Sequence, residues 1–213
     1  MHRFQTPAAI TVTAELAAGE LRVVATDRTD TVVTIRPADA TESADVRAVD
    51  KLQVDFEAGE LRLSTTRQWR DYTPFGGVGS VEVTVEVPTG SRIKAAAGLG
   101  RILGHGELGA SEFDIAAGDI VVERISDTFA AKAATGDIRI GEVVRGEVRV
   151  ETATGELEIG IAPGSAVRLE TDAAAGSVRS ELAPVDVPEN GDIVTVHARN
   201  SLGNIVIRHA VAA

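Results

Sequence analysis

One short pattern recurs along the second half of this 213-residue chain: a glycine, a polar residue and then a strand-like alternating run. Alanine or threonine usually stands before the glycine, as in Ala134-Thr135-Gly136-Asp137-Ile138-Arg139-Ile140. The glycines that carry the pattern are Gly100, Gly118, Gly136, Gly155, Gly176 and Gly203. From each of these glycines to the next the spacing is 18, 18, 19, 21 and 27 residues, so the period is about 19 and loosens toward the C-terminus.

This period limits the folds that the chain can adopt. A strand, a tight corner and a second strand within so short a unit cannot enclose a core, but stacked units can. Apolar residues alternate on both sides of each corner, for example Phe113 and Ile115 before Gly118, and Ile120 and Val122 after it, which gives each strand one inward face. We therefore expect an all-β fold, a β-helix-like β-solenoid of short strands. An antiparallel sandwich or meander is the alternative, and it explains the alternation but not a corner that returns at one period.

The first half of the chain is related but less regular. The same corner occurs at Gly19 and at Gly59, and a long alternating strand covers residues 80–87. No linker separates the two halves, so we expect a single continuous domain over residues 1–213. Within it, residues 1–90 form a less regular β region that caps the stack, and residues 91–213 form repeat coils of about 19 residues.

Composition excludes several classes of protein. The 32 Asp and Glu residues outnumber the 21 Lys and Arg residues, and the net charge of −11 opposes the phosphates of nucleic acids and anionic membrane surfaces. The chain has no cysteine, which removes disulfides, thiolate metal sites and cysteine nucleophiles. We expect no cofactor and no nucleic-acid partner. We also expect no integral membrane segment, because no apolar run approaches the roughly 18 residues that a spanning helix needs.

The N-terminal residues Met1-His2-Arg3-Phe4-Gln5-Thr6-Pro7 lack the apolar stretch of a signal peptide. A cytoplasmic location is the expectation from this feature. Association with the cell surface stays open if a leader precedes this sequence in the cell.

The glycine corners and the sequence Val-Glu-Val-Pro-Thr-Gly-Ser at residues 85–91 resemble the bacterial putative-adhesin, β-strand-repeat family, largely a domain of unknown function. The resemblance runs from about residue 10 to residue 211. It implies a β-solenoid fold and a surface or scaffolding role, and it brings no catalytic residues with it.

The polar residue after each corner glycine gives one candidate site. If the coils stack, Asp119, Asp137 and Glu156 form a column about 4.8 Å apart, and Asn204 and Ser177 continue it. Carboxylates at this spacing could share a hard cation such as calcium. The alternative is that they are ordinary turn carboxylates that accept bonds from backbone amides.

The segment from residue 69 to residue 79 is the second candidate. Trp69, Arg70, Tyr72 and Phe75 lie there in a loop rich in glycine and proline, and they include the only tryptophan and the only tyrosine of the chain. Aromatic side chains on such a loop can bind a ligand or a protein partner. They can also cover an end of the stack or contact a second copy.

Together these patterns predict a protein that is not an enzyme. We expect a non-catalytic β-solenoid scaffold or binding module, with a protein partner or its own copies as the binding partner. The alternative is a carbohydrate-active β-helix enzyme or a glycan-binding protein, in which the aromatic loop would border a groove.

Overall fold

A computed structural model describes residues 1–65, 79–182 and 193–210, and most of these residues lie in strands. The sixteen strands form one large mixed sheet, accompanied in the described part of the chain by one short helix, α1 (Ser43–Lys51). The expected all-β class is thus confirmed. In chain order the strands are β1 (His2–Gln5), β2 (Thr11–Thr26), β3 (Asp30–Pro37), β4 (Leu52–Glu57), β5 (Glu60–Thr65), β6 (Val81–Pro88), β7 (Arg92–Leu108), β8 (Ser111–Ile125), β9 (Phe129–Thr135), β10 (Ile138–Val143), β11 (Gly146–Thr154), β12 (Leu157–Ile161), β13 (Ala166–Ala175), β14 (Val178–Ser180), β15 (Ile193–Leu202) and β16 (Ile205–His209).

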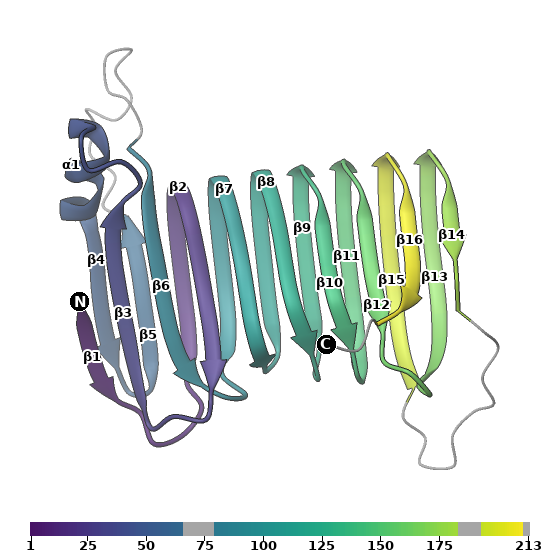
Figure 1. Ribbon diagram of the computed structural model, residues 1–213, viewed down its shortest axis with the longest axis horizontal. Helices are drawn as coiled ribbons and strands as arrows, with labels where there is room; N and C mark the ends of the chain where they lie inside the picture. The colour runs from purple at the N-terminus through teal and green to yellow at the C-terminus, as the bar shows by residue number, and fades with distance from the viewer. Residues whose placement is uncertain (66–78, 183–192, 211–213) are drawn as a thin grey trace.

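The sheet folds back on itself into two facing layers (Figure 1). Strands β2, β7 and β8 are long enough to belong to both layers, the first half of each to one layer and the second half to the other. One layer continues through β9, β11, β15 and β13, and the other through β10, β12, β16 and β14. All of these neighbours pair in parallel, whereas the pairs β1–β3, β3–β6 and β4–β5 are antiparallel.

The corner glycines lie next to one another where the chain passes between the layers. Gly19 is in register with Gly100, and Gly100 with Gly118. We call the whole set the glycine column, and in spatial order it comprises Gly19, Gly100, Gly118, Gly136, Gly155, Gly203 and Gly176. Their φ angles lie between 131° and 151°, a backbone conformation that residues other than glycine rarely adopt. A Cβ atom on Gly118 would also overlap the carbonyl oxygen of Gly100, so conformation and space both require glycine.

The spatial order of the last strands differs from their order in the sequence. Strands β15 and β16 lie between the pair β11 and β12 and the pair β13 and β14, so that β13 and β14 lie at the end of the sheet (Figure 1). The inward residues Val194 and Val196 of β15 are fully buried in this position. The spacing of the glycines in the sequence cannot reveal that β15 and β16 precede β13 and β14 in space, because both orders of strands have the same local sequence pattern.

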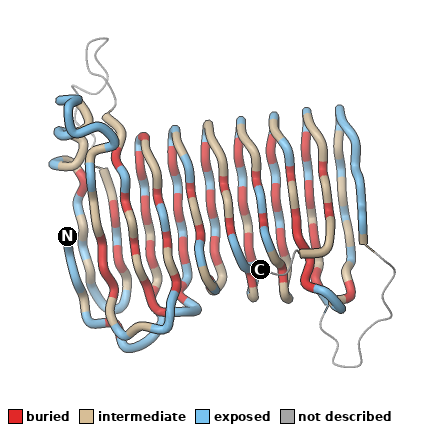
Figure 2. Tube along the Cα trace, in the orientation of Figure 1, coloured by how far each residue is buried: buried red, intermediate tan, exposed pale blue. Residues whose placement is uncertain are grey.

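The core is a series of inward rows between the two layers. Its members are mostly Val, Ile, Leu and Ala, and Figure 2 shows buried residues returning at the same places along successive strands. Phe113 and Phe129 supply larger side chains and meet edge to face, with ring centroids 5.3 Å apart. A core built of thin rows explains how a chain with 3% aromatic residues fills its interior.

The N-terminal end of the sheet is covered by a different arrangement. The β4–β5 hairpin pairs with the first half of β2, and β6, β3 and β1 extend the other layer. Helix α1 contacts β3, β4 and β6, and Phe4 of β1 stacks on Phe56 of β4 at 4.8 Å between ring centroids. This end therefore differs from the parallel stack: within the described residues its outermost strands, β1 and β4, each pair antiparallel with one neighbour.

Ion pairs hold this end together as well. Arg28 donates to Asp30 at 2.9 Å and to Glu86 of β6 at 2.6 Å. The hydrogen bond from Arg28 is the main reason that the pKa of the Asp30 carboxyl lies below its usual value. Arg3 of β1 also pairs with Asp30, at 3.1 Å, so one carboxylate connects two segments.

Gly59 is not a corner of the stack, and the expectation from its sequence is wrong on this point. It lies in the two-residue turn of the β4–β5 hairpin, where Ala58 has φ of 51° and Gly59 has φ of 81°. Positive φ at both central residues is typical of a type I′ hairpin turn. The Ala-Gly-Glu sequence satisfies both geometries, so the pattern alone cannot separate them.

Two glycine substitutions test the role of the column. We expect Gly118→Ala to lower the free energy of unfolding by about 3 kcal/mol or more, because backbone strain and steric overlap act together. Gly59→Ala is the matched control: φ is again positive but no atom lies within 4 Å of an added Cβ, so a loss of about 1 kcal/mol is expected. Urea unfolding of both variants measures the difference, and equal losses would show that close packing at the column is unimportant.

Candidate functional site

The three residues predicted as a column do lie side by side. The backbone N–H of Asp137 donates to Oδ1 of Asp119 at 3.0 Å, and that of Glu156 donates to Oδ1 of Asp137 at 2.8 Å. Asn204 and Ser177 continue the series, since Nδ2 of Asn204 donates to Oε1 of Glu156 at 3.3 Å and the N–H of Ser177 donates to Oδ1 of Asn204 at 3.1 Å. We call these five residues the corner column, and its side chains link one corner to the next.

These contacts show how the carboxylates of the corner column are occupied. Oδ2 of Asp137 accepts from Arg139 at 2.6 Å while Oδ1 accepts the backbone N–H. Over the described ranges of the chain, no group of three or more His, Asp or Glu side chains is arranged to hold a metal ion. Calcium needs six to eight oxygen ligands at about 2.4 Å. Asp119 and Asp137 thus accept backbone amides, as the alternative for these residues predicts. A cation shared by Asp119, Asp137 and Glu156 stays a prediction.

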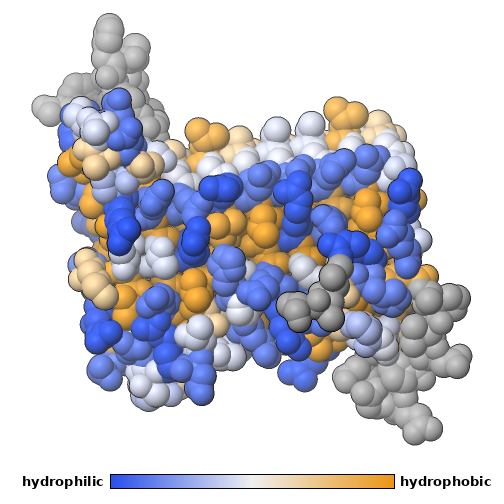
Figure 3. Space-filling model, in the orientation of Figure 1, coloured by the Kyte–Doolittle hydropathy of each residue, from blue (hydrophilic) through white to orange (hydrophobic). Residues whose placement is uncertain are grey.

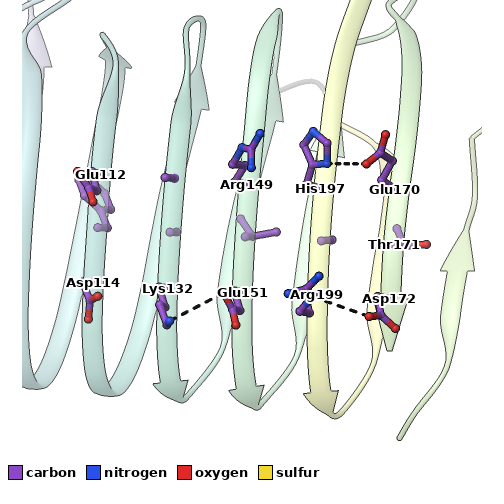
Figure 4. A pocket seen from close by; sticks show the side chains of 15 residues that line it. Glu112, Asp114, Lys132, Arg149, Glu151, Glu170, Thr171, Asp172, His197 and Arg199 are labelled. Carbon is purple, nitrogen blue, oxygen red and sulfur yellow. Dashed lines mark ion pairs between the residues drawn. The ribbon is translucent and has the colours of Figure 1, made fainter. Parts of the chain in front are cut away.

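A shallow hollow of about 600 Å³ crosses the outer face of β8, β9, β11, β15 and β13, and we call it the trough. Two rows of side chains run along it, both visible in Figure 4. One row contains Glu112, Arg149, His197 and Glu170, and the other contains Asp114, Lys132, Glu151, Arg199 and Asp172. The positions of each row are in parallel register on neighbouring strands, with Ala130 of β9 between Glu112 and Arg149, so the trough runs across the strands.

Opposite charges alternate along the second row of the trough. Nζ of Lys132 lies 3.9 Å from a carboxylate oxygen of Glu151, and Nε of Arg199 lies 3.8 Å from one of Asp172. Such cross-strand pairs avoid the repulsion that like charges would cause in a stacked sheet. Because the pairs are exposed, each contributes at most about 1 kcal/mol.

His197 is the most enclosed charged or titratable group of the first row. Its Nδ1 lies 2.9 Å from Glu170 and its Nε2 lies 3.4 Å from Glu147. Glu147 also accepts from Arg149 at 2.7 Å. Glu147 thus lies beside both His197 and Arg149.

Sequence reasoning missed the trough. In the sequence its residues are only the outward members of alternating strands. His197 and Arg199 join the trough because β15 lies between β11 and β13, which separates these two strands. The alternation of positive and negative side chains at register positions of neighbouring strands is a signal in the sequence, but it can be recognised only when the spatial order of the strands is known.

The aromatic loop lies outside the described residues. Trp69, Arg70, Tyr72 and Phe75 all fall between residues 65 and 79. Their predicted role in binding a ligand or a partner stays a prediction.

Two exposed leucines stand directly before corner glycines. Leu99 is 59% exposed and Leu202 is 56% exposed. Ala117, Thr135 and Thr154 lie between them in the same row, so the two leucines form no continuous patch. Figure 3 likewise shows separate hydrophobic areas among hydrophilic side chains.

The described part of the chain contains no helix that is both long enough and apolar enough to cross a membrane.

No protein-family model matches the chain, and no curated protein sequence matches it. Solved structures do match. A putative cell adhesion protein from Clostridium sporogenes shares 13% identity at a TM-score of 0.48, with 98% of each chain covered. A putative lipid binding protein from Parabacteroides distasonis shares 12% identity at a TM-score of 0.42, with 95% of each chain covered. A putative adhesin from Bacteroides fragilis shares 13% identity at a TM-score of 0.39, covering 97% of this chain and 95% of its own. The chain thus matches bacterial putative adhesins in structure over nearly its whole length.

The two interpretations of the corner column differ in a measurable way. We expect Asp137→Ala to lower the free energy of unfolding by about 1–2 kcal/mol, because the N–H of Glu156 loses its acceptor. Asp114→Ala, an exposed position in the trough, is the control and should change it by less than about 0.5 kcal/mol. Added calcium should leave the melting temperature of the unaltered protein unchanged. A rise with calcium that Asp137→Ala abolishes would show instead that the column holds a cation.

Proposed function

We propose that this protein is a non-catalytic β-solenoid scaffold that self-associates and presents its outer face to a protein partner. The observation that carries the proposal is the parallel register of the corner segments, joined through the glycine column. A unit that pairs only with its neighbours builds a rigid, elongated body whose outer surface repeats from coil to coil. Such a body suits a structural or binding role.

The arrangement of charged groups supports a binding role over a catalytic one. In the trough, the side chains of Lys132, Arg199 and His197 each have a carboxylate neighbour on an adjacent strand. Catalysis by acids and bases needs groups whose environments differ and that meet at one substrate atom. A surface of mutually paired charges instead favours recognition by charge pattern.

The trough is the surface that we assign to the partner. Five carboxylates and three Lys or Arg side chains line it, together with His197. This excess of acidic groups suits an extended polypeptide segment that carries Lys or Arg, because complementary charge favours encounter and register.

Self-association can be tested directly. We expect sedimentation velocity over a concentration series to show mass rising from one chain of 22.2 kDa toward two chains. A single species of one-chain mass at every concentration would contradict self-association.

The partner surface can be tested with a displayed peptide library and, in parallel, with a glycan array. We expect selection on the immobilised protein to enrich Lys- or Arg-containing peptides. Their binding should be lost in the variant Glu112→Lys/Glu151→Lys, which reverses two charges of the trough. Glu82→Lys, an exposed position on β6 in the other layer, is the matched control and should bind normally.

Two outcomes would overturn this assignment. Enriched peptides that bind the double variant equally well would place the binding surface elsewhere. Glycans that bind the unaltered protein, with no peptide enriched, would favour the glycan-binding alternative.

A further inference from the structure

The two ends of the sheet differ in how they are finished. At the N-terminal end the outermost strands are short and antiparallel, β1 of four residues beside β3 and β4 of six residues beside β5, and helix α1 contacts β3, β4 and β6. At the other end, within the described ranges, β13 pairs only with β15 and β14 pairs only with β16. Strand β13 is ten residues long, and a long edge strand presents unpaired N–H and C=O groups to any strand that can reach it.

Burial shows that the last coil lacks a neighbour. Val167 and Leu169 of β13 point inward but are only partly buried, whereas their register partners on β15, Val194 and Val196, are fully buried. Figure 2 shows the same change, since the last strands are intermediate or exposed along much of their length. A further strand beside β13 would complete this coil as β15 completes the one before it.

The residues of β13 indicate that β13 of a second copy can pair with this edge. An antiparallel pair about a two-fold axis through Leu169 sets Leu169 against itself on the inner side. On the outer side it sets Arg168 against Glu170 of the second copy, twice by symmetry. All three residues belong to β13, with Arg168 and Glu170 exposed. Glu170 also lies 2.9 Å from Nδ1 of His197 in its own chain, so in the dimer it lies between His197 and Arg168 of the second copy.

Neighbouring registers fit less well. A two-fold axis through Arg168 or through Glu170 would set two like charges against each other, which is destabilising in a sheet. An axis through Thr171 would set Glu170 against Asp172, again two carboxylates. Among these registers, the one centred on Leu169 alone sets opposite charges against each other, and it does so twice.

We propose that two copies of this chain join through antiparallel pairing of their β13 strands, centred on Leu169. The layers that contain β13 become continuous, and the two N-terminal ends lie at opposite tips. The interface is isologous, so the β13 edge of each copy is occupied by that of the other and the pairing ends at a dimer. This proposal rests on the self-association in the proposed function and names its surface and symmetry.

A charge-swap series tests the interface. Arg168→Glu alone and Glu170→Arg alone each place like charges in both symmetric pairs, so we expect dimerisation at least about tenfold weaker in sedimentation velocity. The double variant Arg168→Glu/Glu170→Arg should dimerise as the unaltered protein does. An equimolar mixture of the two single variants should form a heterodimer, because every pair across that interface is again opposite in charge.

Arg92→Glu, an exposed position on β7, is the matched control and should dimerise normally. Circular dichroism and thermal unfolding establish that each variant is folded, and the mixture provides the decisive result even if one single variant is less stable.

The outcomes separate the two proposals. A dimer that persists in both single variants overturns this interface and leaves self-association standing. A one-chain mass for the unaltered protein at all concentrations overturns both. Masses that grow beyond two chains with concentration overturn the closed, two-fold arrangement.

Discussion

The close approach of backbones at the corner glycines is the constraint on which the rest of the structure depends. At Gly100, Gly118 and Gly136 the preceding glycine carbonyl occupies the space that a Cβ would need. Adjacent corners can therefore pack directly against one another, and the strands on both sides of each corner enter parallel register. The register aligns the inward rows that form the core, so a steric requirement at one atom per unit sets the packing of both layers.

The same register determines the outer surfaces. At the corners it places the polar side chain of one unit beside the next unit, where Asp119, Asp137 and Asn204 accept a backbone N–H and Glu156 accepts the side-chain amide of Asn204. On the layer that includes β11 and β15 it sets Lys132 beside Glu151 and Arg199 beside Asp172. Parallel stacking brings equivalent positions together, and these positions must therefore differ in charge or carry acceptors for backbone amides. It also leaves the edge of the ten-residue strand β13 without a further strand among the described residues, because a stack of like units has no built-in terminus.

The local part of this architecture could be predicted from sequence. Glycines at a period near 19, apolar alternation and the polar residue after each glycine are properties of single segments, and they led correctly to the all-β class and to the adjacency of Asp119, Asp137 and Glu156. The position of β15 between β11 and β13, and the trough that results, depend on which segments meet, which spacing does not encode. Gly59 shows the converse limit, because the same three residues also fit a hairpin turn.

The order and register of the strands underlie both the trough and the open β13 edge, and cysteine cross-linking measures them most directly because the chain has no cysteine of its own. Glu151 and Arg199 are register partners on β11 and β15, whereas Glu151 and Asp172 have β15 between them. We expect Glu151→Cys/Arg199→Cys to form an intramolecular disulfide under mild oxidation. Glu151→Cys/Asp172→Cys should not, because two strand spacings, about 9.6 Å, exceed the reach of a disulfide. The reverse result would contradict the stacking order and the surfaces derived from it.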